Sequence, residues 1–210
     1  MKQYSVIIPT LNEEKGLELI LPKLKKLGYD SIVIVDADST DHTVDVALKY
    51  GAKVVKQVGI GLVAAELQGM GSVDADRYIV MDGDGQHRPE DIPSLLKSNA
   101  DLVIGARIQR DDTAFRRLVS AGAKWLARTG LQDPTSGFRV YSRRAARYLI
   151  QQGIKHHDYL GQIEIIKKLQ KAGFTVEERP ISFAKRVGGK SHLSPLVILQ
   201  YLFASLSGFE

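Results

Sequence analysis

The amino-acid sequence predicts an α/β fold, a single domain with a mostly parallel β-sheet flanked by helices. Short apolar runs rich in Val and Ile alternate with helical stretches through the first half of the chain, and this spacing favours βαβ units. The runs lack strict apolar–polar alternation, as expected for strands buried on both faces. The length of 210 residues suits one well-packed domain.

The first half reads as a regular series of strands and helices. Strands are expected at Ser5–Ile8, Ser31–Val35, Lys53–Lys56, Tyr78–Met81 and Asp101–Ile104. Helices are expected between them at Glu13–Leu27, Thr43–Tyr50, Leu62–Gly71 and Asp91–Ser98.

The second half departs from this series. In order, we expect a helix at Thr113–Thr129, a loop leading into a strand over Asp133–Tyr141, helices at Arg143–Gln151 and Tyr159–Ala172, a strand at Thr175–Ile181, a basic loop at Lys185–Ser191 and an apolar helix at Pro195–Leu206. No linker divides the halves, so the later elements should extend the same sheet. Residues 1–194 then form the folded domain, and residues 195–210 carry the apolar C-terminal helix.

The composition excludes some classes of protein. The sequence has no cysteine, which excludes disulfides, thiolate catalysis and Cys-based zinc sites. The N-terminal apolar run Tyr4–Ile8 is too short for a signal peptide. No stretch approaches the roughly 20 apolar residues of a spanning helix. We therefore expect a protein that is not integral to a membrane by its own sequence.

Basic residues gather in the middle of the chain. Between residues 107 and 147 the sequence has ten Lys or Arg and three Asp, a net charge of +7, whereas the rest carries −2. This predicts an anionic partner, and the alternative is a solvated helix face. A smaller basic cluster comprises Arg179, Lys185, Arg186 and Lys190.

The strongest local signal is the segment Met81–His87, with sequence MDGDGQH. Asp82 and Asp84 follow an expected strand, and ligands gather outside the carboxyl ends of strands in open α/β sheets. Residues two apart in extended chain point to the same side. With the Gln86 amide oxygen, these carboxylates form a hard oxygen-donor set suited to Mg²⁺ or Mn²⁺. The alternative is an acidic turn of the kind that Asp-Gly pairs form.

Two further polar loops follow the first and second expected strands, Pro9–Glu14 and Asp36–Asp41. Ser39, Thr40 and Asp41 are candidates to cap the next helix. All three strand-end loops should lie on one edge of the sheet. Together they predict a pocket for a ligand with hydroxyls, a base and metal-bound phosphates.

Four sequence elements then point to a known family. They are PTLNE at Pro9–Glu13, the Asp36 loop, DGDGQHRPE at Asp82–Glu90 and DPTSGFR at Asp133–Arg139. Their order and spacing resemble family 2 glycosyltransferases of the Rossmann-like GT-A fold. Within that family the chain is similar to the polyprenyl (dolichyl) phosphate mannosyl- and glucosyltransferases. The resemblance runs from about residue 4 to residue 194.

The resemblance implies a donor pocket and a metal site. The nucleoside pocket would be lined by Pro9, Asn12 and Glu13, with Asp36 near the base or ribose. Mg²⁺ or Mn²⁺ on the donor diphosphate would be held by Asp82, Asp84 and Gln86. GDP-mannose is the first choice of donor and UDP-glucose the second, and no nucleic-acid partner is expected.

The resemblance also implies an acceptor site for a polyprenyl or dolichyl phosphate. Arg117, Ser136 and Arg139 would receive the acceptor phosphate and, with Asp84, form the catalytic set. Arg186 and Lys190 would close over the diphosphate and the acceptor. A lipid-phosphate oxygen would attack the anomeric carbon with inversion as nucleoside diphosphate leaves.

No side chain stands out as a general base, and none is needed, because a phosphate acceptor is already ionised near neutral pH. His87, His156 and His157 are interpreted as structural or surface histidines. Two departures from the family pattern concern donor recognition. Ala37 stands where members have an acid or a Gly, and Ile60 stands between two glycines where many have Lys.

The final helix, Pro195–Leu206, is apolar nearly all round and too short to span a bilayer. We expect it to lie in a membrane interface, and the alternatives are a core helix or an oligomer contact. The expected location is the cytoplasm, peripherally attached to the cytoplasmic face of a membrane. A membrane-spanning partner subunit is a further candidate partner.

Three other functions compete with this interpretation. A family 2 transferase with a soluble-sugar or glycan acceptor is disfavoured by DPTSGFR and the basic segment. A sugar nucleotidyltransferase would need a Gly- and Arg-rich loop after the first strand, which Pro9–Glu14 lacks. A catalytically silent recruitment subunit is disfavoured by the intact set of candidate site residues.

Overall fold

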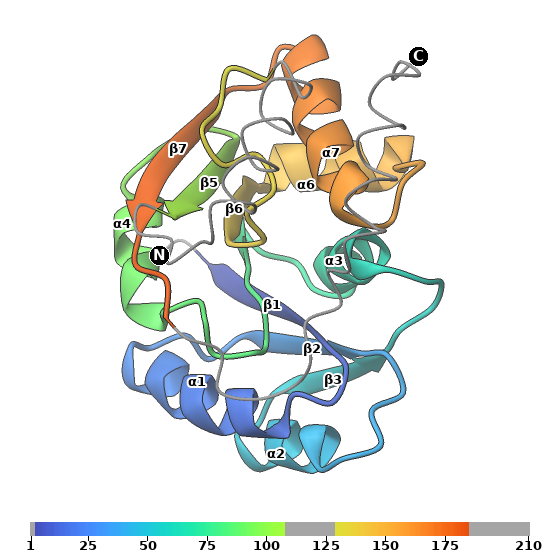
Figure 1. The fold of residues 1–210 in the computed structure, drawn as a ribbon, viewed down its shortest axis with the longest axis vertical. Helices are drawn as coiled ribbons and strands as arrows, with labels where there is room; N and C mark the ends of the chain where they lie inside the picture. The colour runs from blue at the N-terminus through green and yellow to red at the C-terminus, as the bar shows by residue number, and fades with distance from the viewer. Residues whose placement is uncertain (1–2, 108–128, 185–210) are drawn as a thin grey trace, which may run out of the picture.

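The computed structural model describes residues 3–107 and 129–184, which form a seven-stranded sheet with helices around it (Figure 1). The strands are β1 (Tyr4–Thr10), β2 (Ile32–Asp36), β3 (Lys53–Lys56), β4 (Arg77–Val80), β5 (Leu102–Arg107), β6 (Arg139–Ser142) and β7 (Val176–Ile181). The helices are α1 (Glu14–Lys26), α2 (Thr43–Lys49), α3 (Leu62–Gly71), the 3₁₀ helix η1 (Pro89–Asp91), α4 (Ile92–Leu96), α6 (Arg143–Gln152) and α7 (Tyr159–Lys171).

The sheet order is β3-β2-β1-β4-β6-β5-β7. β1 runs parallel to β2 and β4, β2 to β3, and β5 to β7. β6 is antiparallel to both of its neighbours, β4 and β5. The predicted single-domain, mostly parallel α/β sheet is confirmed, and the later strands extend it as expected. The reversal at β6 is the one feature of the sheet that the sequence did not indicate.

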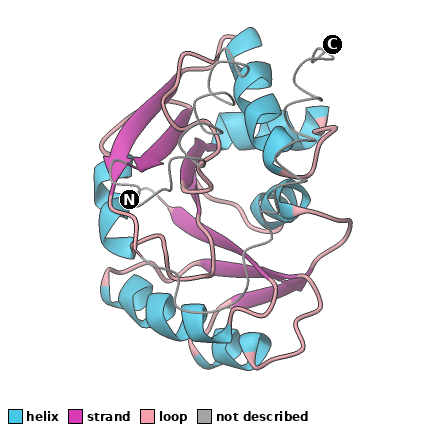
Figure 2. Cartoon of the chain, in the orientation of Figure 1, coloured by secondary structure: helices cyan, strands magenta, loops and turns pink. Residues whose placement is uncertain are grey.

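Each strand buries side chains in two separate cores. In β1, Val6 and Ile8 pack with residues of α1, α2 and α4 in the first core. Ile7, between them, packs with residues of α3, α6 and α7 in the second. Figure 2 shows the strands lying between these two sets of helices. Burial on both faces explains why the strands read as continuous apolar runs.

Side-chain caps mark the N-terminal ends of α6 and α7. The Ser142 and Asp158 side chains accept hydrogen bonds from the first turns of α6 and α7, satisfying amide groups that have no partner within the helix. The expected helix Asp91–Ser98 is shorter, because it begins as η1 and α4 ends at Leu96. Pro93, in the first turn of α4, allows the helix to start only there.

Some expected elements fall outside the described residues. These are the basic loop Lys185–Ser191, the apolar helix Pro195–Leu206 and all but the end of the helix Thr113–Thr129. Within residues 3–107 and 129–184, no helix is both long and apolar enough to cross a membrane.

Candidate active site

The loops after β1 and β2 are joined at the carboxyl edge of the sheet. Asn12, which has a left-handed φ of 57°, accepts the Thr40 N–H at 2.7 Å and donates its own N–H to the Ser39 hydroxyl at 2.9 Å. Pro9 lies three residues before Asn12, in β1, where it is paired with Val35 of β2. This is the edge at which open α/β sheets bind ligands.

The shape of the second loop is fixed by hydrogen bonds among its own residues and with the end of β1. The Asp36 carboxylate is buried and accepts hydrogen bonds from the Thr10 hydroxyl at 3.1 Å and the Ser39 N–H at 2.9 Å. Of the predicted caps, Asp41 accepts the Thr43 N–H at the start of α2. The Glu13 N–H donates to the Thr43 hydroxyl at 2.8 Å. In this structure Asp36 therefore helps to fix the shape of this loop, and its contact with a base or ribose stays a prediction.

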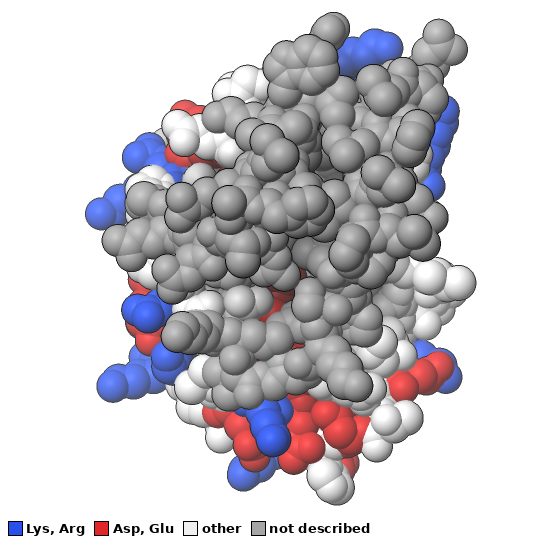
Figure 3. Space-filling view, in the orientation of Figure 1, with Lys and Arg blue, Asp and Glu red and all other residues white. Residues whose placement is uncertain are grey.

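Acidic side chains gather at the end of the molecule formed by α1 and α2 (Figure 3). Glu14 opens α1 there, and Asp45 lies in the first turn of α2. The chain as a whole has a net charge of +5, so this acidic end contrasts with the basic middle of the sequence. Hydrogen-bond donors such as sugar hydroxyls suit this side of the edge better than bare phosphates do.

The third loop follows β4 and contains the predicted metal ligands. The Asp82 side chain is 38% exposed, whereas Asp84 is buried and accepts the Gln86 N–H at 2.9 Å. The Gln86 amide nitrogen donates to the Ala184 carbonyl at 3.3 Å. That bond commits the nitrogen end of the amide and leaves the oxygen as the end that can bind a cation.

Glycines let the chain pass closely around this loop. A Cβ at Gly16, in α1, would stand 1.9 Å from the Gly83 carbonyl oxygen. A Cβ at Gly83 would in turn meet the Thr10 side chain at 3.1 Å. Because backbone presses on backbone at Gly16, no larger residue fits without moving the loop. Helix α1 thus supports the predicted metal loop directly.

His87 anchors the far end of the same loop. Its Nδ1 accepts the Asp82 N–H at 3.1 Å, so Nδ1 carries no proton and the ring hydrogen is on Nε2. Burial lowers the pKa of His87, although Asp82 and Asp84 oppose the shift. The 3.5 Å approach of Nδ1 to the Asp82 carboxylate is therefore no ion pair. The ring stacks on Phe138 at 5.0 Å and contacts Phe183 at 5.6 Å, which supports its interpretation as a structural histidine.

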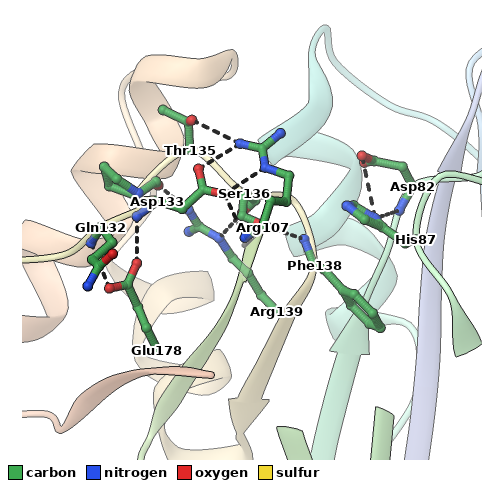
Figure 4. A network of polar contacts seen from close by, with 11 residues as sticks. Asp82, His87, Arg107, Gln132, Asp133, Thr135, Ser136, Phe138, Arg139 and Glu178 are labelled. Atoms are coloured by element: carbon green, nitrogen blue, oxygen red, sulfur yellow. Dashed lines mark hydrogen bonds and ion pairs between the residues drawn. The ribbon is translucent and has the colours of Figure 1, made fainter. Parts of the chain in front are cut away.

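The DPTSGFR loop is held at its start by two charged side chains (Figure 4). The Arg107 guanidinium donates two hydrogen bonds of 2.6 Å to the Asp133 carboxylate. The Glu178 carboxylate accepts the N–H groups of Gln132 and Asp133 at 2.6 and 2.7 Å. Charge-assisted contacts of this kind are short and directional. They fix the entry to the loop from β5 on one side and β7 on the other.

Gly137 brings the DPTSGFR loop against the predicted metal loop. A Cβ at this position would lie 2.9 Å from an Asp82 carboxylate oxygen. Gly137 and Asp82 are far apart in sequence, yet a side chain at position 137 would have to displace the Asp82 carboxylate. The structure thus places next to one another the two segments that carry the family resemblance most specifically.

Arg139 occupies a different place from the one the sequence suggested. Its side chain is fully buried, and its guanidinium donates to the carbonyls of Pro134 at 2.7 Å, Ser136 at 2.8 Å and Gln162 at 3.2 Å. Ser136 is fully buried as well. Binding of the acceptor phosphate by Arg139 stays a prediction, and in the structure the register of β6 turns this side chain into the protein, where it meets backbone carbonyls. Arg117, Arg186 and Lys190 lie outside the described residues.

Two residues next to this region were missed from the sequence. Glu66 in α3 and Gln162 in α7 are both fully buried, and the Gln162 amide donates to Glu66 at 2.6 Å. The available signal was a single acid inside the apolar stretch LVAAELQGM, since unpaired acids are rarely buried.

A divalent cation fits the chemistry of the third loop. Among the described residues no three His, Cys, Asp or Glu side chains converge on one point, so a metal here would rely on two carboxylates and an amide oxygen. Such an incomplete oxygen set, completed by substrate phosphates and water, is typical of Mg²⁺ in phosphate-binding enzymes. Asp82, Asp84 and Gln86 would hold it.

The sheet and its acidic strand-end loop define a glycosyltransferase of the GT-A fold. More specifically, the chain belongs to glycosyl transferase family 2, whose family model matches residues 5–150.

Curated relatives cover nearly the whole chain. A dolichol-phosphate mannosyltransferase of Pyrococcus furiosus is 34% identical over 94% of this chain and 61% of its own length, so the chain spans about three fifths of that relative. A polyprenol monophosphomannose synthase of Mycolicibacterium smegmatis is 32% identical over 94% of this chain and 83% of its own. A dolichol-phosphate mannosyltransferase of Mycosarcoma maydis is 30% identical over 94% and 76%.

Solved structures confirm the fold. Glucosyl-3-phosphoglycerate synthase of Mycobacterium tuberculosis, in complex with Mn²⁺, UDP-glucose and phosphoglyceric acid, superposes with a TM-score of 0.76 at 20% identity, covering 98% of this chain and 80% of that one. The same enzyme with Mg²⁺ and UDP gives a TM-score of 0.76 at 21% identity, covering 98% and 78%. At this identity the likeness concerns the architecture alone.

Proposed function

We propose that this enzyme transfers a hexose, mannose in the first instance, from a nucleoside-diphosphate sugar to a polyprenyl or dolichyl phosphate. The observation that carries the proposal is the contact of Gly137 with Asp82, which sets the DPTSGFR loop beside the metal loop. The relatives at 30 to 34% identity, two dolichol-phosphate mannosyltransferases and a polyprenol monophosphomannose synthase, support the mannosyl donor and the lipid phosphate. GDP-mannose is the proposed donor.

The proposed step joins an oxygen of the lipid phosphate to the anomeric carbon and breaks that carbon's bond to the diphosphate, with inversion. A divalent ion at Asp82, Asp84 and Gln86 would neutralise charge on the departing diphosphate. The loops joined by Asn12 and Thr40 would hold the nucleoside, with Glu13 and Asp36 in the pocket wall. This preorganisation places the donor without further rearrangement of the two loops.

The acceptor requires no general base, because a phosphate monoester is already ionised near neutral pH. Its charge must instead be balanced, and for this we propose Arg117, Arg186 and Lys190, on the strength of the family resemblance. In this proposal Arg139 supports the DPTSGFR loop by hydrogen bonds to its Pro134 and Ser136 carbonyls and does not bind the phosphate. The metal and these side chains would then balance the negative charges of the donor diphosphate and the acceptor phosphate.

A lipid acceptor implies work at a membrane surface. We propose peripheral attachment at the cytoplasmic face through the apolar segment Pro195–Leu206, with a membrane-spanning partner subunit as an additional anchor. Flotation with anionic liposomes tests this. The full chain should float, and a chain ending at Ser194 should not; equal flotation of both would remove this segment from the proposal.

The activity is tested by supplying radiolabelled GDP-mannose and UDP-glucose in parallel, with a short polyprenyl phosphate and Mg²⁺ or Mn²⁺. Label should move into the organic phase from GDP-mannose. Asp84→Ala should reduce the rate on the order of a hundredfold or more, whereas Asp30→Ala, an 84% exposed carboxylate, should not. Transfer from UDP-glucose instead would change the assigned donor. Metal-dependent nucleotide binding without transfer from either donor would contradict the proposed sugar or acceptor.

A further inference from the structure

The buried Glu66 and Gln162 leave a specific pair of atoms without partners. The Gln162 amide nitrogen donates to one Glu66 oxygen at 2.6 Å. The other Glu66 oxygen and the Gln162 amide oxygen are both buried without a hydrogen-bond partner. Two acceptors cannot bond to each other, and burial deprives both of water as a partner, which is unfavourable. One proton on Glu66 makes its second oxygen a donor and can satisfy both atoms at once.

The charged groups around Glu66 are consistent with this proton. Arg139 on β6 favours the ionised form, whereas burial and the Asp82 carboxylate disfavour it more strongly. The side chain of Tyr141, also on β6, is buried together with its hydroxyl. Arg139 does not donate to the Glu66 oxygen that lacks a partner, because its guanidinium donates to three backbone carbonyls instead. Among residues 3–107 and 129–184, no cation therefore holds Glu66 ionised through a direct contact.

The pair is connected to the predicted metal loop through one residue, Arg139. Gln162 uses its side chain to bond Glu66 and its backbone carbonyl to accept from Arg139 at 3.2 Å. Arg139 spans from there to the carbonyls of Pro134 and Ser136, within the loop whose Gly137 faces Asp82. The position of α7 at Gln162 thus sets how that loop lies on Asp82.

We propose that Glu66 and Gln162 form a carboxylic acid–amide pair and act as positioning residues for the 133–138 loop, and thereby for Asp82. The role in metal binding rests on the proposed function, whereas the role in ordering the loop does not. Neither residue touches substrate. The pair acts through Arg139, and its essential property is two complementary hydrogen bonds rather than a negative charge.

The test compares Glu66→Leu and Gln162→Leu with Glu66→Gln, which replaces the acid by an amide that can make the same two bonds. Amide hydrogen exchange of residues 132–138 is the primary measurement and needs no metal. The half-saturating Mn²⁺ concentration in the transfer assay is the second. Gln68→Leu is the control, because Gln68 lies in the same helix but bonds to Val58 and Lys56, away from Arg139.

Both Leu variants should speed exchange in the loop and raise the Mn²⁺ requirement on the order of tenfold, while Glu66→Gln and the control stay at the wild-type level. Exchange as fast in Glu66→Gln as in Glu66→Leu would show that the charge matters and overturn the proposal. Unchanged exchange in both Leu variants would overturn it as well. If the loop loosens while the wild type shows no metal dependence, the positioning role stands and the proposed metal site fails.

Discussion

The backbone N–H of Asp82 donates to Nδ1 of His87 over 3.1 Å, so a predicted metal ligand and a buried imidazole belong to one rigid turn. His87 is enclosed by Phe138 and Phe183, and Phe183 also pairs with it in an isolated antiparallel bridge. Phe138, directly before β6, and Phe183, after β7, thereby help to determine the shape of a loop that follows β4.

His87 should remain neutral across the physiological range. Burial lowers its pKa, and the accepted hydrogen bond occupies the nitrogen that would take the second proton. Imidazole ¹⁵N NMR should therefore show an unprotonated Nδ1 from about pH 6 to pH 8. The exposed His42, whose pKa is raised mainly by its hydrogen bond with Asp45, should titrate within the same series. A His87 signal that moves together with that of His42 would contradict this tautomer.

Gly137→Ala should weaken metal binding without unfolding the protein. The added methyl would press on an Asp82 oxygen at 2.9 Å and displace the carboxylate, for a loss on the order of tenfold in Mn²⁺ affinity. Gly71→Ala is the control, because its Cβ would meet only Ile150 at 3.8 Å. Calorimetric titration with Mn²⁺ and nucleotide measures both. Equal affinities in the two variants would mean that the contact has no bearing on the metal site.

Glu66 should make the protein less stable as the pH rises. Burial raises the pKa of Glu66 from 4.5 to about 7, so the folded protein keeps a proton that the unfolded chain releases. Its contribution is fully present below about pH 4.5 and is lost as the pH rises to about 7. One pKa unit corresponds to about 1.4 kcal/mol, so the loss is on the order of 3 kcal/mol.

Urea unfolding at several pH values measures this loss, with Glu66→Gln as the reference. The wild-type free energy of unfolding should fall relative to the variant over that interval, because Gln cannot release a proton. Parallel curves for the two proteins would show that Glu66 does not change its protonation state differently on folding.

Arg107→Lys should destabilise the protein more than Arg144→Lys. Arg107 makes its paired contact with a nearly buried Asp133 and lies 5.3 Å from the Phe183 ring, and Lys reproduces neither the fork nor the stacking. A loss of about 1–3 kcal/mol is expected. Arg144 also donates through two nitrogens to Asp101 and lies 4.5 Å from the Phe174 ring, but its side chain is 68% exposed. Water screens these contacts, so its replacement should cost less than about 1 kcal/mol. Thermal unfolding of the two variants gives the comparison, and equal losses would contradict it.

The parallel part of the sheet could be predicted because its strands are marked locally. Ile32–Asp36 and Arg77–Val80 are apolar runs with turns on either side, and their parallel pairing follows from the helices between them. The position of β6 could not be predicted in this way. Four residues, Arg139–Ser142, carry no sign that they insert between β4 and β5, since that choice depends on pairing across the whole fold.

The candidate site shows the same difference between features marked by local sequence and features that depend on the whole fold. Asp82, Asp84 and Gln86 could be proposed as metal ligands from sequence because they directly follow a strand, and this role stays a prediction. The burial of Arg139 could not be predicted, because a motif gives the charge of a residue but not its register. Opposite Val80 and Ile104 in the sheet, its side chain is enclosed by the protein and meets backbone carbonyls instead of phosphate.

The insertion of β6 also bears on how the chain is made. β5 pairs with β6 and β7 and not with β4, so it emerges from the ribosome before the strand that connects it to the rest of the sheet exists. Until residue 142 has been synthesised, β4 and β5 both have open edges of the kind that recruit other chains. A nascent chain that ends between these strands therefore presents unpaired edges that favour misassembly, and that interval includes the segment from which the DPTSGFR loop will form.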